Sequence, residues 1–541
     1  MRVRTLVLLA SALLCLAEGC GENAAPITFD YEKLNAQARQ EYLQPVHPGL
    51  SGEQPFWNGY SFKFIYAPAF DFKDIDGAAS YSYTAKAGGR DFSFRAETPR
   101  EALSEIWDVL PVGDVELCVQ GLNAAGEPVG EPQRRSFAKD HPFCGPYEDG
   151  GNDYLQAAIR DAEYVHLSAI SQGWAKGAEP DMEYGLNCYP SKIWSGTIRT
   201  ELFLAAHRPQ YRQQALQIAR NAADALIDFS QKDGDALPGF PPTYFCPEGV
   251  ELIWYLKRVI DRNRPYTMFA DAVMAADALL DIYDATKEKK YFLHACKIAE
   301  TYRNLQAEDG SWPVKVSWST GEPVTPGRCM PTTILQLAAR LKGQYGVKGF
   351  DRMISKTEEW LWTNTISNFN FNGQFEDITV ADKAAYQNLT NCIAVDCVDY
   401  FLSKEHPSKK EIAACCEIVR FAEDQFTRWQ SELKDDSHPE IEPLTTPFVY
   451  EQYSFQCPID SSTACVAMAW MHIYRLTGDL LALAKAKALL DTLVKVQDPE
   501  TGCIPTSLYM TWSHDCTEDW SNCAFNSIRA LVQLDGILNG K

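Results

Sequence analysis

The sequence lacks the short motifs of several large enzyme classes. It contains no Gly-x-x-x-x-Gly-Lys-Ser/Thr phosphate loop, no Gly-x-Gly-x-x-Gly fingerprint, no Gly-x-Ser-x-Gly turn and no His-Glu-x-x-His pair. Nucleotide binding, serine-hydrolase chemistry and zinc-protease chemistry therefore have no support. Cys-x-x-Cys pairs are also missing, so a structural zinc site has no support either. We expect no metal and no cofactor.

Positive charge is also scarce. The chain carries 50 Lys and Arg against 72 Asp and Glu, which gives a net charge of −22. This balance argues against a nucleic-acid partner, because phosphate binding needs clustered Lys and Arg. A local basic pocket for one carboxylate is still compatible with it. The apolar fraction of 46% over 541 residues indicates a packed globular protein with more than one domain.

Long apolar runs are confined to the N-terminus. Arg2 and Arg4 precede an apolar stretch over residues 6–17, and Ala17 and Gly19 provide an Ala-x-Ala-like cleavage site before Cys20. This arrangement predicts a signal peptide over residues 1–19 that is cut before Cys20. The run is too short for a membrane-spanning helix, and no later stretch is long and apolar enough to be one.

The residues around the predicted cut resemble a bacterial lipobox, in which the first Cys of the mature chain carries lipid. Glu18 departs from that pattern, because a small residue is usual there. We favour lipid attachment at Cys20, and ordinary secretion is the alternative. The resemblance implies an exported protein, in the periplasm or at the cell surface, anchored to a bacterial membrane with residues 20–54 as a tether.

The 17 cysteines do not predict a disulfide framework, because a chain of this length does not need one and their spacing is uneven. Six of them fall in apolar helical stretches, where Cys usually behaves as a small buried hydrophobe. A disulfide between Cys516 and Cys523, or one that involves Cys503, stays open. The six are Cys296, Cys392, Cys397, Cys415, Cys416 and Cys465.

Residues 55–145 alternate between apolar and polar side chains in short runs rich in aromatic and β-branched residues, such as 60–66, 80–84 and 114–119. Gly-containing turns separate the runs. This pattern predicts a small all-β sandwich. The segments 74–81 and 110–130 resemble a fibronectin type III-like domain, which implies a spacer between the tether and a catalytic domain.

From about residue 150 to 541 the apolar period becomes helical, and the chain repeats itself. Residues 276–306 align without gaps to residues 467–497, an offset of 191 residues. Each copy has two helices joined by a Thr-containing turn, followed by Gln and an acidic Gly loop that we interpret as a structural turn. One helical hairpin takes about 60–65 residues, so two copies three hairpins apart would lie opposite each other in a ring of six. We predict an (α/α)6 toroid, with an open α-solenoid as the alternative.

The loops between the predicted hairpins are rich in Trp, Tyr and carboxylates. In a concave mouth, aromatic rings stack on sugars and carboxylates supply acid and base. The alternative is that the aromatic side chains simply plug the end of the ring. We interpret Asp277 and Asp281 as solvated helix-face carboxylates. The candidate substrate-binding residues are Tyr189, Trp194, Arg199, Arg264, Tyr266, Trp312, Tyr450, Tyr453 and Trp520.

Three residues are candidates for catalysis. Asp377 lies in an acidic loop, and His514 lies beside Asp515 in an aromatic loop, where a carboxylate can tune proton transfer near neutral pH. The segment 269–274, with the residues after it to 291, resembles the unsaturated glucuronyl and rhamnogalacturonyl hydrolases. That resemblance implies that Asp271 is the acid that protonates an unsaturated uronide. The alternative for Asp271 is a helix cap.

These features favour an exported glycoside hydrolase that acts on oligosaccharides containing uronic acids. A polysaccharide lyase would instead use a Tyr or His base, with Arg199 or Arg264 neutralising the uronate. A surface protein that binds glycans without catalysis would use the aromatic loops alone. We expect an oligo- or polysaccharide as the partner in each case.

Overall fold

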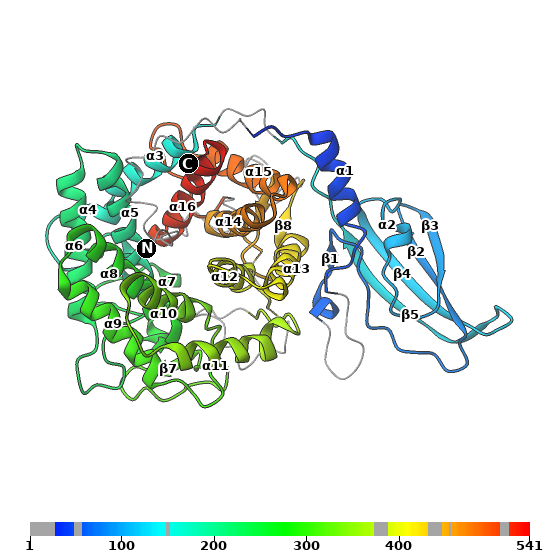
Figure 1. The fold of residues 1–541 in the computed structure, drawn as a ribbon, viewed down its shortest axis with the longest axis horizontal. Coiled ribbons are helices and arrows are strands. Elements are labelled where there is room, and N and C mark those ends of the chain that lie inside the picture. Colours follow the sequence, from blue (N-terminus) through cyan, green and yellow to red (C-terminus); the bar gives the residue numbers. More distant parts are fainter. Residues whose placement is uncertain are drawn as a thin grey trace, which may run out of the picture.

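The computed structural model describes residues 27–47, 57–147, 152–372, 388–430, 446–453, 456–508 and 519–540. A β-sheet module and a large helical ring lie side by side, with helix α1 (Tyr31–Glu41) between them (Figure 1). None of the helices in these ranges has both the length and the apolarity needed to cross a bilayer.

The N-terminal module is built on one five-stranded sheet in the order β1-β5-β4-β2-β3. Its hairpin β2–β3 turns at Gly88 and Gly89, whose φ angles of 56° and 73° suit the tight turns that match strand twist. One face of the sheet is buried and the other is open, so the alternating pattern predicted the strands correctly. The strands are β1 (Lys63–Phe64), β2 (Ser80–Ala87), β3 (Arg90–Ala96), β4 (Gly113–Leu122) and β5 (Pro128–Lys139).

The predicted sandwich is not confirmed. Among residues 57–147, which the structure describes, we find one sheet and not two. A short helix, α2 (Ser104–Trp107), and the segment before β2 cover the buried face in place of a second sheet. Trp107 is buried there, and its indole N–H donates to the carbonyl of Ile65 at 2.9 Å.

Within the described residues, six helices form the inner wall of the ring. Each contacts the next, and α16 contacts α5, so the ring closes (Figure 1). This closure confirms the toroid and excludes the open solenoid. The inner helices, in ring order, are α5 (Ser195–His207), α8 (Ala272–Thr286), α10 (Thr332–Tyr345), α12 (Asn391–Leu402), α14 (Asp460–Thr477) and α16 (Ser521–Leu538).

One outer helix packs on each inner helix. Helix α13, for example, starts at a capping box in which Ser408 and Glu411 each bond the other's main chain. The outer partners, in the same order, are α6 (Arg212–Phe229), α9 (Lys289–Asn304), α11 (Asp351–Leu361), α13 (Lys409–Phe426), α15 (Leu480–Val496) and α3 (Tyr154–Leu167).

Short elements lie in the connections. The helical ones are α4 (Ala169–Gln172), α7 (Trp254–Asn263), η1 (Trp57–Tyr60), η2 (Gly185–Cys188), η3 (Pro190–Trp194), η4 (Phe269–Asp271) and η5 (Trp362–Ile366). The strands are β6 (Tyr266–Met268), which pairs with β7 (Lys315–Ser317), and β8 (Thr427–Arg428), which pairs with β9 (Phe448–Val449).

The two repeat copies are the hairpins α8–α9 and α14–α15, and they lie opposite each other, with two inner helices between them on each side. The repeated Gln is a structural tie. The Gln306 amide donates to the carbonyl of Met353 at 3.0 Å, and the Gln497 amide donates to the carbonyl of Ala157 at 2.9 Å. Each Gln therefore joins its loop to the outer helix of the next hairpin, as a structural turn requires.

The module and the ring share a buried polar junction at Glu423, near the end of α13. Its carboxylate accepts hydrogen bonds from the hydroxyls of Tyr42 (2.6 Å) and Tyr66 (2.7 Å), and from the ammonium of Lys485 (2.8 Å). Helix α1, which lies within the predicted tether, packs on α15. The predictions of a tether and of a separate spacer therefore need correction, because these segments are packed parts of one body.

Candidate functional site

The inner helices begin at one end of the ring. The Ser527 hydroxyl of α16 lies 2.9 Å from Asp460, the first residue of α14, and the Cys392 thiol of α12 lies 3.9 Å from the Ser462 hydroxyl of α14. Gly196 of α5 touches the main chain of Asn522 so closely that a Cβ would lie 2.3 Å from the Asn522 nitrogen. The amino ends of these helices therefore meet, and we call this end the mouth.

The carboxyl groups of Asp396 and Asp399 lie on the face of α12 that points to the ring axis. Both residues are partly exposed, although α12 is an inner helix. Asp396 interacts electrostatically with Arg529 of α16, which is not its neighbour in the ring. Burial, and then the nearby Asp399, raise the pKa of Asp396 to about 7, while Arg529 acts in the opposite direction.

Two further groups lie beside Asp396 and Asp399, and both belong to α14. The Cys465 thiol interacts with Asp396, Asp399 and Arg529. The His472 ring nitrogen Nε2 lies 3.3 Å from the Asp399 carboxylate. Burial lowers the pKa of His472, so the imidazole is neutral at neutral pH. We call Asp396, Asp399, Cys465, His472 and Arg529 the axial cluster.

A segment at the mouth adds another carboxylate. Residues 450–453 cross the start of α12, where the Asn391 amide donates to the carbonyl of Glu451 at 3.0 Å. Glu451 is partly exposed and interacts electrostatically with Cys392, which also interacts with Asp396. Cys392 therefore lies near both carboxyl groups, and Glu451 is a second acidic candidate beside the axis.

The opposite half of the axis carries paired charges. The Asp281 carboxylate of α8 accepts hydrogen bonds from Arg199 of α5 at 2.7 Å and from Arg340 of α10 at 2.6 Å. Arg340 also bonds Asp277 at 3.1 Å. Burial opposes ionisation of Asp281, but the two guanidinium groups hold its pKa below the ordinary value. We call Arg199, Asp277, Asp281 and Arg340 the paired cluster.

These pairings correct two predictions. Asp277 and Asp281 are not solvated helix-face carboxylates, because they point to the axis and bind arginines. Arg199 does lie inside the ring, as a substrate-binding residue would, but its guanidinium is already paired with Asp281. It is therefore a structural cation in this arrangement.

The predicted aromatic residues divide between core and mouth. Trp194 and Trp312 are fully buried, and their indole N–H groups donate to the carbonyls of Asn187 (3.3 Å) and Tyr302 (2.9 Å). With no exposed ring face they belong to the core, which corrects the prediction that they bind substrate. Tyr189 is also buried. Trp520 is partly exposed, stacks on Tyr189 with the ring centres 5.3 Å apart, and lies at the start of α16.

Asp271 lies at the mouth, immediately before α8, and is partly exposed. Its side chain makes no capping hydrogen bond to that helix, so the helix-cap alternative is not supported. Tyr266 is partly exposed in β6, and Arg264 is exposed at the end of α7. The structure places these two side chains in the connection that leads to Asp271.

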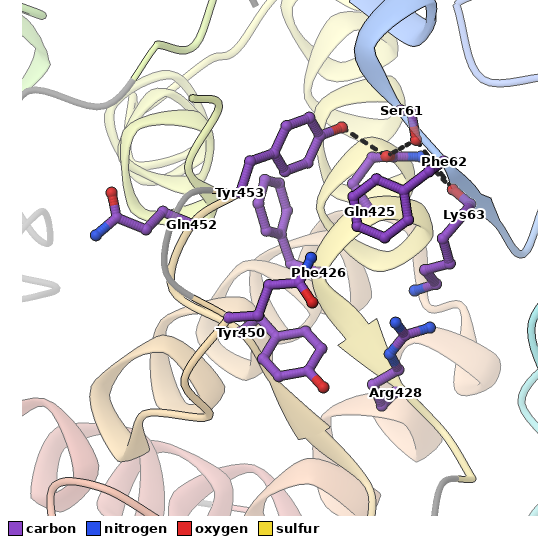
Figure 2. Close-up of a pocket in the computed structure, with 10 residues that line it drawn as sticks. Ser61, Phe62, Lys63, Gln425, Phe426, Arg428, Tyr450, Gln452 and Tyr453 are labelled. Carbon is purple, nitrogen blue, oxygen red and sulfur yellow. Dashed lines mark hydrogen bonds between the residues drawn. The ribbon is translucent and has the colours of Figure 1, made fainter. Parts of the chain in front are cut away.

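Tyr450 and Tyr453 lie away from the axis, in a pocket between the ring and the N-terminal module (Figure 2). The Tyr453 hydroxyl donates to the Gln425 side chain at 2.5 Å. Tyr450 is buried, and the Arg428 guanidinium lies 5.4 Å from its ring centre. Asp377, His514 and Cys20 lie outside the described residues.

Sequence reasoning missed the axial cluster. The available signal was Asp396 and Asp399, two carboxylates at i and i+3 within the apolar run of residues 391–402. Such a pair on one face of an apolar helix indicates a polar surface inside the fold.

Every cysteine in the described ranges is a free thiol, Cys503 and Cys523 included. In the same ranges, no group of His, Cys, Asp and Glu is arranged to hold a metal ion.

Comparisons with known proteins give similar shapes at low identity. No family model and no curated protein matches the chain. A family 76 glycoside hydrolase from a bovine Bacteroides thetaiotaomicron strain superposes with a TM-score of 0.47 and 9% identity, over 85% of this chain and 94% of its own. A cellobiose 2-epimerase from Spirochaeta thermophila gives 0.48 and 12%, over 71% and 98%. An unsaturated glucuronyl hydrolase specific for heparin gives 0.46 and 11%, over 72% and 98%. At these values the likeness does not identify reacting residues.

Proposed function

We propose that the protein is a carbohydrate-active enzyme, a glycoside hydrolase that cleaves oligosaccharides containing uronic acids by acid/base catalysis. The observation that carries the proposal is Asp396, a partly exposed carboxyl group on the ring axis whose pKa is raised to about 7. A carboxylic acid that keeps its proton near neutral pH is suited to act as a general acid.

A hydrolase of this kind needs a second carboxylate to activate water or to attack the sugar. Glu451 and Asp271 are the candidates, because both are partly exposed at the mouth. In this scheme Asp396 gives its proton to the leaving oxygen, and the second carboxylate takes a proton from the attacking water. Trp520 offers a partly exposed ring on which a sugar can stack.

The test is a screen of purified protein against acidic oligosaccharides, both native and lyase-treated. Hydrolysis of an unsaturated uronide removes its conjugated double bond and its ultraviolet absorbance, whereas a lyase creates that absorbance. We expect Asp396→Asn to reduce kcat by about 10²–10⁴-fold, the usual contribution of a general acid. Asp351→Asn is the matched control, because Asp351 is an exposed carboxylate, with a side-chain exposure of 73%.

Three results would contradict the proposal. If the native and the treated pools are both unchanged while glycans still bind, the protein is a binder. If absorbance rises, it is a lyase. If Asp396→Asn retains full activity, the acid is another residue, and Asp271→Asn and Glu451→Gln identify it.

We also propose that the chain is exported and anchored through lipid on Cys20. The signal-like residues 1–19 and the lipobox-like residues 16–20 support this proposal. Cys20→Ser should move the protein from the membrane fraction to the soluble periplasmic or secreted fraction. An unchanged distribution would contradict the anchor.

A further inference from the structure

Helix α16 presents one polar face to the ring axis. Asn522, Asn526 and Arg529 are partly exposed, and they follow one another at intervals of four and three residues, so they lie on one side of the helix. Ser527, between them in the sequence, is buried. Because α3, α5 and α14 pack on the rest of α16, the side that solvent reaches is the side toward the axis.

Arg529 differs from the two arginines of the paired cluster. Arg199 and Arg340 are both ion-paired with Asp281. In the part of the chain that the structure describes, no carboxylate pairs with the Arg529 guanidinium and no acceptor takes a hydrogen bond from it. Its side chain lies beside Phe525, with Cζ 6.0 Å from the centre of that ring. The N–H groups of Arg529 are therefore available to a ligand.

The Arg529 guanidinium lies between the two halves of the axis. It interacts electrostatically with Asp396 of α12 and with Cys465 of α14. It also interacts with Arg199 of α5, whose Cζ lies 4.3 Å from the centre of the same Phe525 ring. A group bound to Arg529 would therefore lie close to Asp396, the proposed acid.

The surroundings of Arg529 favour an anionic ligand. Asp396 has a raised pKa of about 7, so below that pH it is largely uncharged and does not compete for the guanidinium. The other carboxyl group of α12, Asp399, contacts the His472 ring at 3.3 Å. A planar guanidinium without a partner fits a carboxylate, because two parallel N–H groups can bond its two oxygens.

Two other arginines were candidates for binding a uronate, and the structure favours neither. Arg199 is already paired with Asp281. Arg264 is exposed at the end of α7 and does not belong to an inner helix. Arg529 has both properties that the role needs, a place on the axis and N–H groups available to a ligand.

Arg529 also lies along α16 from Trp520, which precedes this helix at the mouth and offers a partly exposed ring. Arg529 is nine positions after Trp520, which corresponds to about 13 Å along a helix. Side chains on a helix lean toward its amino end, so the guanidinium lies nearer the mouth than its own Cα. A saccharide that stacks on Trp520 and extends along α16 would bring a following unit to Arg529.

From this arrangement we propose that Arg529 binds the carboxylate of the substrate's uronate unit and selects acidic over neutral saccharides. The inference deepens the proposed function, on which it rests for the class of ligand. It gives Arg529 a role in recognition and leaves the proton transfer to Asp396.

The experiment measures binding of free glucuronate and galacturonate to the full wild-type chain by saturation-transfer NMR, with glucose and galactose as neutral controls. These monosaccharides contain no bond to a second sugar, so turnover does not interfere. At pH ~6, below the pKa of Asp396, we expect the uronates to bind about tenfold more tightly than the neutral sugars, or better, from the charge-assisted hydrogen bonds.

Three variants assign the preference to one side chain. Arg529→Gln should remove it, and Arg529→Lys should retain part of it, because the charge remains while the two-pronged geometry is lost. Arg352→Gln is the matched control, because Arg352 is exposed on the outer helix α11. Circular dichroism of each variant checks folding.

A preference for uronates that Arg529→Gln abolishes, and that Arg352→Gln preserves, supports the inference. Equal binding of neutral sugars, no uronate binding, or a preference unchanged in Arg529→Gln would overturn it. If Arg529 acted only on Asp396, Arg529→Gln would shift the pH dependence of kcat/KM and leave the preference unchanged. If Arg529→Gln does not fold, Arg529→Lys decides, because uronate binding as tight as in the wild type contradicts the inference.

The substrate screen of the wild type decides the proposed function separately. Uronate binding that depends on Arg529, without cleavage of any saccharide, contradicts the hydrolase and not this inference. Cleavage of neutral saccharides, without a preference for uronates, contradicts this inference and leaves the acid/base chemistry of Asp396 in place.

Discussion

The two halves of the helical ring share a scaffold but differ in their axial charges. Residue 281 of α8 and residue 472 of α14 correspond under the 191-residue repeat. In α8 the position is Asp281, bonded to two arginines. In α14 it is His472, a neutral imidazole beside Asp399. The paired cluster thus balances its charges, whereas the axial cluster leaves Asp396 with a raised pKa.

The difference shows how one architecture can separate stability from chemistry. A carboxylate between two arginines is fixed in position and stays ionised. A carboxyl group that shares its surroundings with another acid and a neutral His keeps its proton and is free to transfer it. We therefore assign the paired cluster to holding the ring closed, and under the proposed function the axial cluster is the reactive one.

The largest expected effect on stability comes from removing a carboxylate of the paired cluster. Asp281→Asn removes the carboxylate that bonds both Arg199 and Arg340 and leaves only Asp277 of this cluster to balance them, so we expect a loss of about 3–5 kcal/mol in the free energy of unfolding. Chemical denaturation measures it. Asp396→Asn is the matched change in the other half, and it should cost less than about 1 kcal/mol, because a neutral amide does not have to be desolvated as an ion. Equal losses in the two variants would refute the comparison.

The pH dependence of the axial half is the second prediction. Asp396 has a raised pKa of about 7. As a general acid it must be protonated, so kcat/KM should fall above pH ~7, approaching about tenfold per pH unit.

Stability should follow the same group. Between its ordinary pKa and about 7, the unfolded state loses the Asp396 proton and the folded state keeps it. Folding stability therefore declines as pH rises through this window. Asp396→Asn should flatten that slope. The rate profile has its own check. If the fall of kcat/KM above pH ~7 persists in Asp396→Asn, a group other than Asp396 controls the rate.

A smaller effect tests the symmetry of the scaffold itself. Gln306 and Gln497 make equivalent ties to the next outer helix, at 3.0 and 2.9 Å. Gln306→Leu and Gln497→Leu should each cost about 1–2 kcal/mol, because each removes the hydrogen bonds that the amide donates to two main-chain carbonyls. Thermal or urea unfolding of the two variants should give similar losses. A cost confined to one copy would mean that the repeat is not energetically symmetric.

Sequence patterns predicted the ring because helical periodicity and a repeat are local properties of the chain. The 191-residue offset was enough to place α8 opposite α14. The axial charges were not predictable in this way, because Asp277 and Asp281 have the same spacing on a helix whether that face meets water or an arginine from another hairpin. Similarly, Trp194 and Trp312 are aromatic residues in loops, and only the packing of neighbouring hairpins buries them.

The β-sheet module illustrates a related limit. Alternation predicted its strands, since it follows from a sheet with one buried face. It does not specify what covers that face, and here the cover is α2 with the segment before β2 instead of a second sheet. Helix α1, in the predicted tether, was missed because its contact with α15 joins residues more than four hundred positions apart, as in the bond from Lys485 to Glu41.

Glu423 has a consequence for how the chain unfolds. Its carboxylate joins Tyr42 and Tyr66 on the N-terminal side to Lys485 in the ring, with no water-facing surface of its own. Separating the two parts would strand that charge in an apolar setting, so neither part should melt alone. Calorimetry of the whole chain should show one cooperative transition, and Glu423→Gln should split it in two. The sequence pattern changes from strand-like to helical near residue 150, but the two parts on either side of that position should unfold as one cooperative unit.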